Sequence, residues 1–365
     1  MQTSLIILGN SLRPNTIFLQ YIDSHVNQAI GEYEQCVFLD KSDKDIFLRL
    51  ENILKSSQMT YIVASKDSFN LANKIIATLS EDSLVLKNDT LIPSKAQNFS
   101  KNSYLLESEN FSVSVILAEE TYGLPSLHVK QKEQNRVFSL IDLDEDAVKI
   151  FLEPLAATYE IKLATSTLIE GWVLVQAQTL KYGDRENFLK ATKSLFPNKF
   201  IQEQNIAKFI VNTLSTYGKK IATAESCTGG SIASLITSVS GSSAVFDGGI
   251  VSYANEIKHA WLGVNEETLH HFGAVSEECL SQMLEGILDA SKADFAVATS
   301  GIAGPNGGSE SKPVGTVFVG AKGKNGAVLI ERLLLRGDRA YIQKQSCYHA
   351  LKLLLRVAED LFFAK

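Results

Sequence analysis

Ala222-Thr223-Ala224-Glu225-Ser226-Cys227-Thr228-Gly229-Gly230 is the stretch that decides the fold of the last part of this chain. An apolar run from Ile221 leads into it, and a helical pattern from Ser231 to Ile236 follows it. This order predicts a strand, a tight turn and a helix. The free backbone N–H groups of a helix N-terminus favour negative charge beside such a turn. The same residues also fit an ordinary strand-to-helix turn with a Ser or Thr cap.

The turn carries two groups that could attack a carbonyl, the hydroxyl of Ser226 and the thiol of Cys227. Attack on an amide creates an oxyanion, which needs fixed hydrogen-bond donors. Gly229 and Gly230 would let the backbone approach a ligand closely. Glu225 is either an acid catalyst or the carboxylate at the helix N-terminus, and Cys227 also fits a small buried residue.

Composition limits the class of protein. The chain has 365 residues, enough for two or three domains, and it is 45% hydrophobic and 21% charged. A net charge of −6 argues against a general nucleic-acid or anionic-membrane surface, but it leaves room for a local phosphate pocket. The four cysteines are scattered and the N-terminus lacks signal-peptide features, so we expect a cytoplasmic protein with reduced thiols. We find no apolar run of about 18 residues that would span a membrane.

The first part, residues 1–140, alternates between short apolar runs and amphipathic segments. This alternation predicts a parallel sheet with helices on both faces. We expect strands at 4–8, 36–39, 60–64 and 111–117, helices at 15–30, 46–54 and 68–79, and short strands and loops between 81 and 110.

The remainder predicts two more α/β parts. Residues 141–200 form a small connector in which a helix from residue 142 ends at Pro154, followed by strands at 160–168 and 171–177 and a helix at 184–195. Residues 203–365 form the last domain, which is expected to be α/β/α. Its expected strands begin at Ile221 and cover 246–253, 294–299, 314–321 and 327–335, and its expected helices cover 206–217, 255–262, 276–292 and a long closing segment to Phe363.

Three polar loops, 225–230, 252–258 and 300–308, each follow a predicted strand. Ligands of α/β sheets bind at the carboxyl ends of strands, so the loops could share one crevice. They would bring together the hydroxyl of Ser226, the amine of Lys258 and the phenol of Tyr253. This set suits acyl transfer by a serine nucleophile, provided that burial or a neighbouring cation lowers the pKa of the lysine.

Each of these residues also has an ordinary structural role. Lys258 would commonly be a solvated helix residue, and Tyr253 a half-buried residue at the rim of a strand. Arg339 could bind a phosphate, or pair with Asp338 or another surface carboxylate. The pair His270-His271 lacks the spacing of metal ligands, so we expect no metal and no cofactor.

Seven motifs of the last domain, taken together, resemble the CinA family over about residues 203–362. They are the opening stretch from Thr223 to Gly230, Ser240-Gly241-Ser242-Ser243, residues 248–255 (GGIVSYAN), Gly273-Ala274-Val275-Ser276, residues 300–308 (SGIAGPNGG), residues 312–317 (KPVGTV) and Gly337-Asp338-Arg339. The number and order of the motifs make the resemblance specific.

The resemblance implies an amidohydrolase that converts nicotinamide mononucleotide to nicotinate mononucleotide and ammonia, recycling pyridine nucleotide. It implies Ser226 as nucleophile, Lys258 and Tyr253 as proton carriers, and the backbone N–H groups after Ser226 as oxyanion donors. Ser300, the glycine loop to Gly308 and Arg339 would hold the nucleotide, chiefly its phosphate. The full set of expected substrate-binding residues is Glu225, Cys227, Thr228, Gly229, Gly230, Ser243, Asn255, Ser300, Gly301, Gly304, Gly307, Gly308 and Arg339.

The first part resembles the molybdopterin-binding-like domain of longer CinA members, which is associated with a pyrophosphatase activity on ADP-ribose. Its opening, Leu8 to Leu12 and Asn15 to Leu19, partly fits that domain. A glycine-rich loop with paired carboxylates should follow the third strand, but Ala64 to Asn70 reads ASKDSFN. Asp67 alone does not replace the missing carboxylates. We therefore expect this domain to keep its fold and to have lost metal-dependent pyrophosphatase activity.

Two other functions stay open on the sequence. The chain could be a catalytically idle nucleotide-binding scaffold or partner-binding protein, or it could be an amidase for another amide. We expect a small-molecule nucleotide as the ligand, no nucleic-acid or membrane partner, and a homo-oligomer, most simply a dimer. The apolar stripe Leu351, Leu354, Leu355 and Val357 could pack internally or form the dimer contact.

Overall fold

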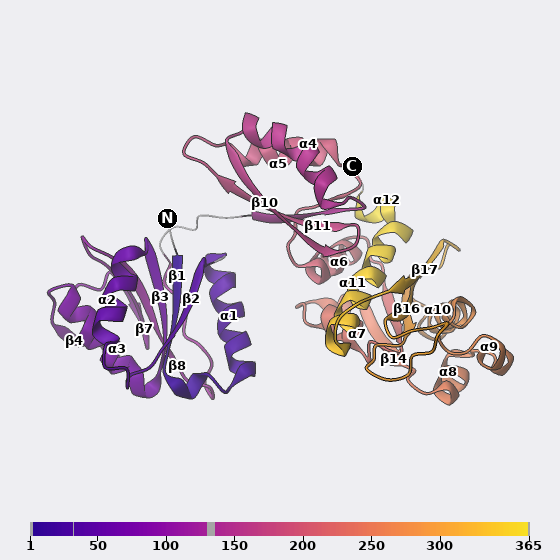
Figure 1. The fold of residues 1–365 in the computed structure, drawn as a ribbon, viewed down its shortest axis with the longest axis horizontal. Coiled ribbons are helices and arrows are strands. Elements are labelled where there is room, and N and C mark those ends of the chain that lie inside the picture. Colours follow the sequence, from indigo (N-terminus) through magenta and orange to yellow (C-terminus); the bar gives the residue numbers. More distant parts are fainter. Residues whose placement is uncertain (1–2, 32, 130–135, 364–365) are drawn as a thin grey trace. The chain divides into compact units, whose positions relative to one another are not determined.

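The computed structural model describes residues 3–31, 33–129 and 136–363, and the protein is a mixed α/β chain. It divides into two compact units, residues 1–136 and 137–365 (Figure 1). Residues 136–201, which include the expected connector 141–200, form a sheet of their own, and all of them but Arg136 lie inside the second unit. None of the helices in the described ranges combines the length and apolar character that a membrane crossing requires.

The first unit is built on a six-stranded sheet with the order β2-β1-β3-β8-β7-β6. Strands β2, β1, β3 and β8 are parallel, and β7 and β6 extend the sheet antiparallel. Both faces of the sheet carry buried apolar clusters, as the predicted alternation requires. The elements are β1 (Thr3–Leu8), η1 (Asn10–Leu12), α1 (Thr16–Ile30), β2 (Gln35–Leu39), α2 (Ile46–Ser56), β3 (Met59–Ser65), α3 (Lys66–Leu79), β4 (Leu84–Lys87), β5 (Thr90–Pro93), β6 (Asn98–Ser100), β7 (Ser103–Glu107) and β8 (Ser112–Ala118).

The connector is a four-stranded sheet, order β10-β11-β9-β12, packed on two helices. Its helix α4 does not end at Pro154, as the sequence predicts, but continues for another turn to Thr158. Proline removes one backbone hydrogen bond, and the burial of Ala156 in the connector core favours the extra turn. The elements are β9 (Arg136–Ile141), α4 (Glu145–Thr158), β10 (Ile161–Ile169), β11 (Trp172–Thr179), α5 (Arg185–Leu195) and β12 (Phe200–Ile201).

The last part is a five-stranded sheet, order β14-β13-β15-β16-β17, between two helical layers. Strand β13 is parallel to both neighbours, and β16 and β17 continue the sheet antiparallel. The elements are α6 (Ile206–Thr216), β13 (Ile221–Glu225), α7 (Ser231–Thr237), η2 (Ser242–Ala244), β14 (Phe246–Val251), α8 (Asn255–Leu262), α9 (Glu266–His271), α10 (Glu277–Ser291), β15 (Phe295–Gly301), β16 (Thr316–Gly323), β17 (Val328–Leu334), α11 (Arg339–Val357) and α12 (Glu359–Phe362).

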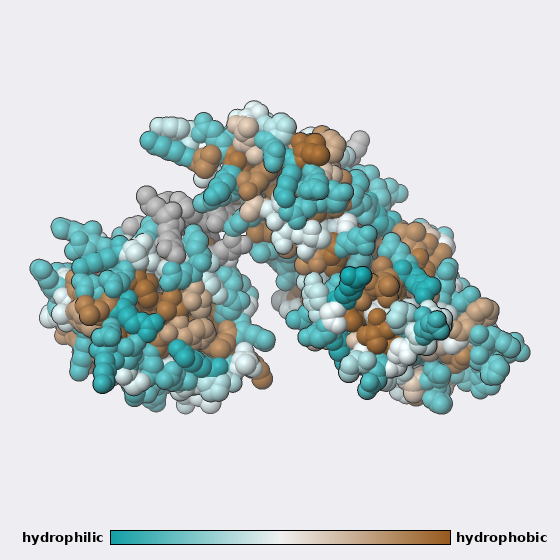
Figure 2. Space-filling model, in the orientation of Figure 1, coloured by the Kyte–Doolittle hydropathy of each residue, from teal (hydrophilic) through white to brown (hydrophobic). Residues whose placement is uncertain are grey.

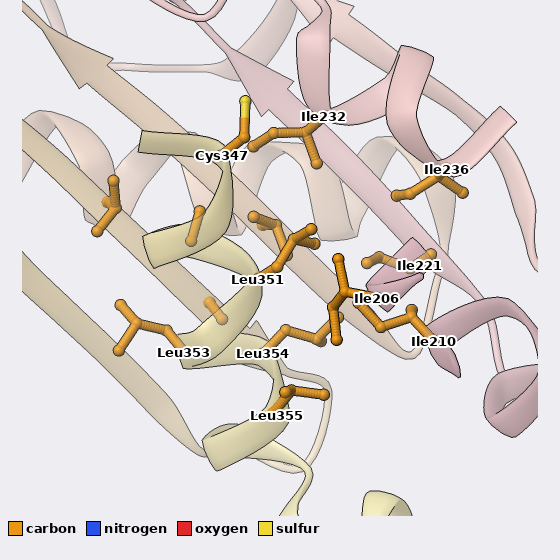
Figure 3. Close-up of a cluster of buried hydrophobic side chains, with 14 of the residues drawn as sticks. Ile206, Ile210, Ile221, Ile232, Ile236, Cys347, Leu351, Leu353, Leu354 and Leu355 are labelled. Atoms are coloured by element: carbon orange, nitrogen blue, oxygen red, sulfur yellow. The ribbon is translucent and has the colours of Figure 1, made fainter. Parts of the chain in front are cut away.

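One face of this sheet packs on α6, α7 and α11, and the other packs on α10. Figure 3 shows leucines of α11 beside isoleucines of α6, α7 and β13. Leu351, Leu354 and Leu355 are fully buried in this cluster, so the apolar stripe packs internally and not on a free surface.

Several boundaries differ from the predictions, and strand β9 of the connector sheet begins at Arg136, within the range 1–140 expected for the first part. The closing segment is two helices, because Ala358 leaves the helical conformation and α12 then buries Phe362 with its ring 5.7 Å from that of Phe209. Strand β14 ends at Val251, before Tyr253. The short helix α9 follows Asn265, which the sequence analysis did not recognise as a helix start.

The surface in view is mostly hydrophilic, with apolar side chains in small groups (Figure 2). This is the ordinary surface of a folded chain and does not by itself indicate a docking site.

Candidate active site

The carboxyl ends of three adjacent parallel strands place the candidate nucleophile. Ser226 comes directly after β13, and its N–H donates to Thr299 O of β15 at 3.0 Å. On the other side, the N–H of Ser252 donates to Glu225 O at 2.8 Å. The ladder therefore continues past the end of β13 on both sides and brings the loops after β13, β14 and β15 to one edge of the sheet.

Glu225 caps helix α7 and does not face the pocket described below. Its carboxylate accepts hydrogen bonds from the backbone N–H groups of Gly230, Ile232 and Ala233 at 2.8–3.1 Å, and from the hydroxyl of Thr228 at 2.7 Å. The side chain is 1% exposed. A buried carboxylate is tolerated here because several donors and the helix dipole stabilise its charge. Of its two roles open on the sequence, the structure shows the carboxylate at the helix N-terminus.

Lys258 is the partner of Ser226. Helix α8 begins at Asn255 and directs this lysine inward, where its Nζ lies 2.9 Å from Ser226 Oγ. The same nitrogen lies 2.5 Å from the carbonyl oxygen of Ser252 and 3.4 Å from that of Tyr253. The side chains of Ser226 and Lys258 therefore meet in one site, and the lysine is not a solvated helix residue.

The surroundings of Lys258 favour its neutral form. The residue is 1% exposed, and burial lowers the pKa of its amine from the usual 10.5. A neutral amine has two N–H donors and one lone pair. The carbonyl oxygens of Ser252 and Tyr253 can accept both N–H groups, which leaves the lone pair for the hydroxyl proton of Ser226.

A cavity of about 210 Å³ opens over these two residues. Its lining combines polar groups with the small apolar side chains of Ala274, Val275 and Ala303. It is lined by Ser226, Cys227, Tyr253, Lys258, Ala274, Val275, Ser300, Gly301, Ala303 and Arg339. A flat, partly apolar group could therefore lie beside the Ser226–Lys258 pair.

Arg339 and Tyr253 form the mouth of the cavity. One guanidinium nitrogen donates to Gly304 O and another to the hydroxyl of Tyr253, each at 2.9 Å. Asp338 does not pair with Arg339, because its carboxylate caps helix α11 through the N–H of Tyr341. The charge of Arg339 thus faces two neutral acceptors, which is an arrangement suited to an incoming anion. Tyr253 is 62% exposed, so it is a rim residue.

Cys227 is a poor candidate for the nucleophile. It is 4% exposed, and burial raises the pKa of its thiol to about 12, so it stays protonated at neutral pH. Its backbone carbonyl accepts a hydrogen bond from the side chain of Gln343 in α11 at 2.7 Å.

The other expected substrate-binding residues divide into two groups. Ser300 and Gly301 line the cavity, although the hydroxyl of Ser300 donates to Ala274 O at 2.7 Å. Gly304 offers its carbonyl to Arg339, and its φ of 82° together with Val314 Cγ1, 2.6 Å from an ideal Cβ, requires glycine there. The residues outside the lining are Glu225, Thr228, Gly229, Gly230, Ser243, Asn255, Gly304, Gly307 and Gly308.

The sequence analysis did not assign Ala274, Val275 or Gln343 to the site, whereas Ala303 lies in the loop 300–308 that it assigned to the nucleotide. Ala274 and Val275 lie in the motif Gly273 to Ser276, so this motif could have indicated that they line the site. Gln343 lies 116 positions from its partner Cys227, and nothing in the local pattern points to that contact. Within the described ranges, no group of three or more His, Cys, Asp or Glu side chains could hold a metal ion.

In the first unit, Asp67 lies where the family resemblance leads us to expect a phosphate-binding loop, and it is bound to neighbouring side chains. Asp67, at the start of α3, pairs with Lys41 at 2.5 Å and accepts from Ser65 Oγ at 2.6 Å. These contacts, that with Lys41 first, lower the pKa of the Asp67 carboxyl. A side chain at Gly9 would collide with Ser65 Oγ, 2.1 Å from an ideal Cβ.

Comparison with known proteins places the chain in a family. Residues 203–358 match the model of the CinA C-terminal domain. The chain is 50% identical over 143 residues to nicotinamide-nucleotide amidohydrolase PncC of Enterobacter agglomerans, a match that covers 39% of this chain and 87% of the relative. The corresponding enzyme of Escherichia coli K12 is 46% identical over 149 residues, covering 41% of this chain and 90% of the relative.

A third relative matches nearly the whole chain. It is a protein of Caldicellulosiruptor bescii whose name refers to competence damage, 30% identical over 375 residues that cover 98% of this chain and 86% of the relative. The chain belongs to the CinA family.

Proposed function

We propose that this protein is an amidohydrolase that converts nicotinamide mononucleotide to nicotinate mononucleotide and ammonia, and so serves pyridine nucleotide recycling. The contact that carries the proposal is that of the buried Lys258 Nζ with Ser226 Oγ, 2.9 Å apart in a cavity with an arginine at its mouth. The 50% identity to a relative named for this activity, over the domain that holds the cavity, supports the choice of substrate.

In the first half of the proposed reaction, neutral Lys258 takes the hydroxyl proton of Ser226 as Oγ attacks the amide carbon. The carbonyl oxygen becomes an oxyanion beside the N–H groups of Cys227 and Thr228. As the tetrahedral intermediate collapses, the Lys258 ammonium returns its proton to the leaving nitrogen, and ammonia departs. An ester of Ser226 with the nicotinate group remains.

In the second half, water attacks the ester carbon and gives one proton to Lys258. Collapse of the second intermediate breaks the bond to Ser226, which recovers its proton from Lys258, and nicotinate mononucleotide leaves. Lys258 is the proposed base in both halves. Tyr253 is less well placed for it, because its hydroxyl is engaged by Arg339.

At the cavity mouth, Arg339 is the proposed partner of the substrate phosphate. Its guanidinium is positioned by Gly304 O and the Tyr253 hydroxyl, and no acidic side chain of the described residues forms an ion pair with it. A dianionic phosphate would therefore meet an uncompensated positive charge. The apolar lining of Ala274, Val275 and Ala303 suits the pyridine ring.

Ammonia release from nicotinamide mononucleotide, with nicotinate mononucleotide counted by chromatography, tests the proposal. We expect turnover by the full chain and a loss of about 10³-fold or more in Ser226→Ala, because removal of a nucleophile leaves only the background catalysis of the site. Ser238→Ala, at an exposed serine that ends α7 outside the cavity lining, is the matched control and should keep the rate within about threefold. Equal activity of wild type and Ser226→Ala would refute the serine mechanism. Nucleotide binding with no turnover by either would favour the idle scaffold.

The ligand and assembly predictions stay proposals. We expect a small-molecule nucleotide as the ligand and a homodimer, which light scattering on the eluting full chain would measure. Because Leu351, Leu354 and Leu355 are buried within one chain, that stripe no longer supports the dimer.

A further inference from the structure

One contact at the candidate site takes no part in the proposed steps of hydrolysis. Gln343 lies on α11, one helical turn after Arg339, and its Nε2 donates to the carbonyl oxygen of Cys227 at 2.7 Å. The side chain is partly buried. This short hydrogen bond therefore connects a helix that is distant in the sequence to the turn that carries the nucleophile.

The planar geometry of the peptide bond explains how this hydrogen bond can act on the site. The carbonyl of Cys227 and the N–H of Thr228 belong to one planar trans peptide, so they point in opposite directions. Fixing the carbonyl therefore fixes the N–H. The preceding peptide is held in the same way, because the carbonyl oxygen of Ser226 accepts from the N–H of Gly229 at 3.1 Å.

The two N–H groups of these peptides are the ones that stay available. Among the described residues, neither the N–H of Cys227 nor that of Thr228 donates to another residue. The next two donors are already used, since Gly229 N–H binds Ser226 O and Gly230 N–H binds the Glu225 carboxylate. The turn thus holds both peptides by their carbonyls and keeps both N–H groups unpaired.

We propose that Gln343 is a positioning residue for the oxyanion site: its side-chain amide holds the Cys227–Thr228 peptide so that the N–H of Thr228, with that of Cys227, donates to the oxyanion formed by attack of Ser226. The inference rests on the proposed amidohydrolase function. The hydrogen bond to the carbonyl also polarises the peptide, which strengthens its N–H as a donor. Gln343 touches no reacting atom, and its effect passes entirely through the peptide.

The test compares Gln343→Leu, which removes the donor, with Gln345→Leu on the same helix. Gln345 is a matched control because its Nε2 donates to a backbone carbonyl outside the site, that of Arg336, at 2.9 Å. Loss of a whole oxyanion donor costs about 10²–10³ in kcat. For a donor that is misplaced but present we expect a fall of about 10- to 100-fold in Gln343→Leu, with KM within threefold, and wild-type kinetics in Gln345→Leu.

A second readout separates this role from simple support of the fold. Pyridine-3-boronic acid would form a tetrahedral adduct with Ser226 that carries an oxyanion-like hydroxyl. We expect Gln343→Leu to lose affinity for it by a factor similar to the fall in kcat, and to bind nicotinate mononucleotide as wild type does. If Gln343→Leu does not fold, Gln343→Glu replaces it, with an acceptor in place of the donor at the same size and the same expected result.

Unchanged kcat and boronate affinity in a folded Gln343 variant would overturn the proposal. So would an equal loss of boronate and nicotinate mononucleotide binding, which would indicate a collapsed pocket. Failure of the proposed function looks different: wild type would release no ammonia from nicotinamide mononucleotide, while the difference in boronate affinity between Gln343→Leu and Gln345→Leu would still report on the oxyanion site.

Discussion

At the scale of single residues, the site depends on an amine that is buried without a counter-charge. Lys258 has carbonyl and hydroxyl oxygens as its hydrogen-bond partners, and burial lowers its pKa. The same burial that makes the lysine a usable base makes it unfavourable for the folded chain, because the charged form loses hydration. Burial of Lys258 should therefore affect both the rate of hydrolysis and the stability of the folded chain.

The first consequence concerns the rate of hydrolysis. Only neutral Lys258 accepts a proton, so kcat/KM should rise with pH and level off above the lowered pKa of this amine, which lies below the ordinary 10.5. A pH–rate profile of nicotinamide mononucleotide hydrolysis measures it. Lys258→Arg, which stays charged, should lose at least about 10³-fold at every pH. A profile that rises only above pH 10.5 would contradict the assignment.

The second consequence concerns stability. The unfolded chain binds a proton at Lys258 up to about pH 10.5, whereas the folded chain releases it at lower pH. The unfolded state therefore holds more protons between these two pKa values, and stability rises with pH across that window. We expect Lys258→Met to be inactive but more stable than wild type at pH 7, with a smaller gain at pH 10. Thermal unfolding at the two pH values measures both, and a lower melting temperature for the variant at pH 7 would contradict it.

The sequence placed Ser226 and Lys258 in polar segments that come after predicted strands, and the family resemblance implied their roles as nucleophile and proton carrier. The sequence left Glu225 open between two roles, since a carboxylate before a helix looks the same whether it caps the helix or meets a substrate. It could not find Gln343, whose contact is created by packing of α11 over the sheet. Burial, which decides the state of Lys258 and Cys227, is likewise a property of the packed chain.

At the scale of elements, the decisive feature is the cap of helix α7. Because Glu225 accepts four hydrogen bonds in a buried position, Glu225→Gln would place an NH₂ group against donors. We expect a loss of about 2–5 kcal/mol in the free energy of unfolding, since buried N–H groups would lose their acceptor.

Urea titration of Glu225→Gln measures this loss. Glu256→Gln, an exposed first-turn glutamate of α8, is the control and should change stability by less than about 0.5 kcal/mol. Equal stability of the two variants would mean that the carboxylate contributes nothing beyond what a neutral amide supplies.

Buried apolar runs in the sequence predict the central strands of the sheets. The predicted ranges of β1, β3, β8, β13 and β15 therefore agree with the observed ranges within a few residues. The errors have physical causes. A proline does not stop α4 where the next turn can still bury Ala156, and a run of helix formers from Arg339 onward does not reveal the break at Ala358. Both depend on contacts with other elements, which local propensity does not contain.

At the scale of the whole molecule, the connector and the last domain share a core. Ile141, Ile169 and Trp172 of the connector belong to the cluster that contains α11, and Arg356 of α11 forms an ion pair with Asp142. A division of the chain by pattern alone places a boundary near residue 200, whereas the packed core crosses it. Cutting the chain there would expose buried apolar surface of both parts.

We expect the first unit to lack metal-dependent pyrophosphatase activity. A site for metal-dependent pyrophosphate cleavage needs carboxylates free to hold a divalent cation. Asp67 is instead bound to Lys41 and to the hydroxyl of Ser65, and residues 64–70 contain no glycine that would let a phosphate approach the backbone. An ammonium beside the carboxylate opposes a second cation, because the two positive charges repel.

We therefore expect the full chain to leave ADP-ribose intact with Mg²⁺, Mn²⁺ or Co²⁺, measured as release of AMP, under conditions where it hydrolyses nicotinamide mononucleotide. Lys41→Ala tests the reason: if Lys41 alone blocked a surviving metal site, its removal would start AMP release. We expect none, since one carboxylate does not replace the missing pair. Metal-dependent cleavage by wild type would show that the unit keeps the activity through residues other than Asp67.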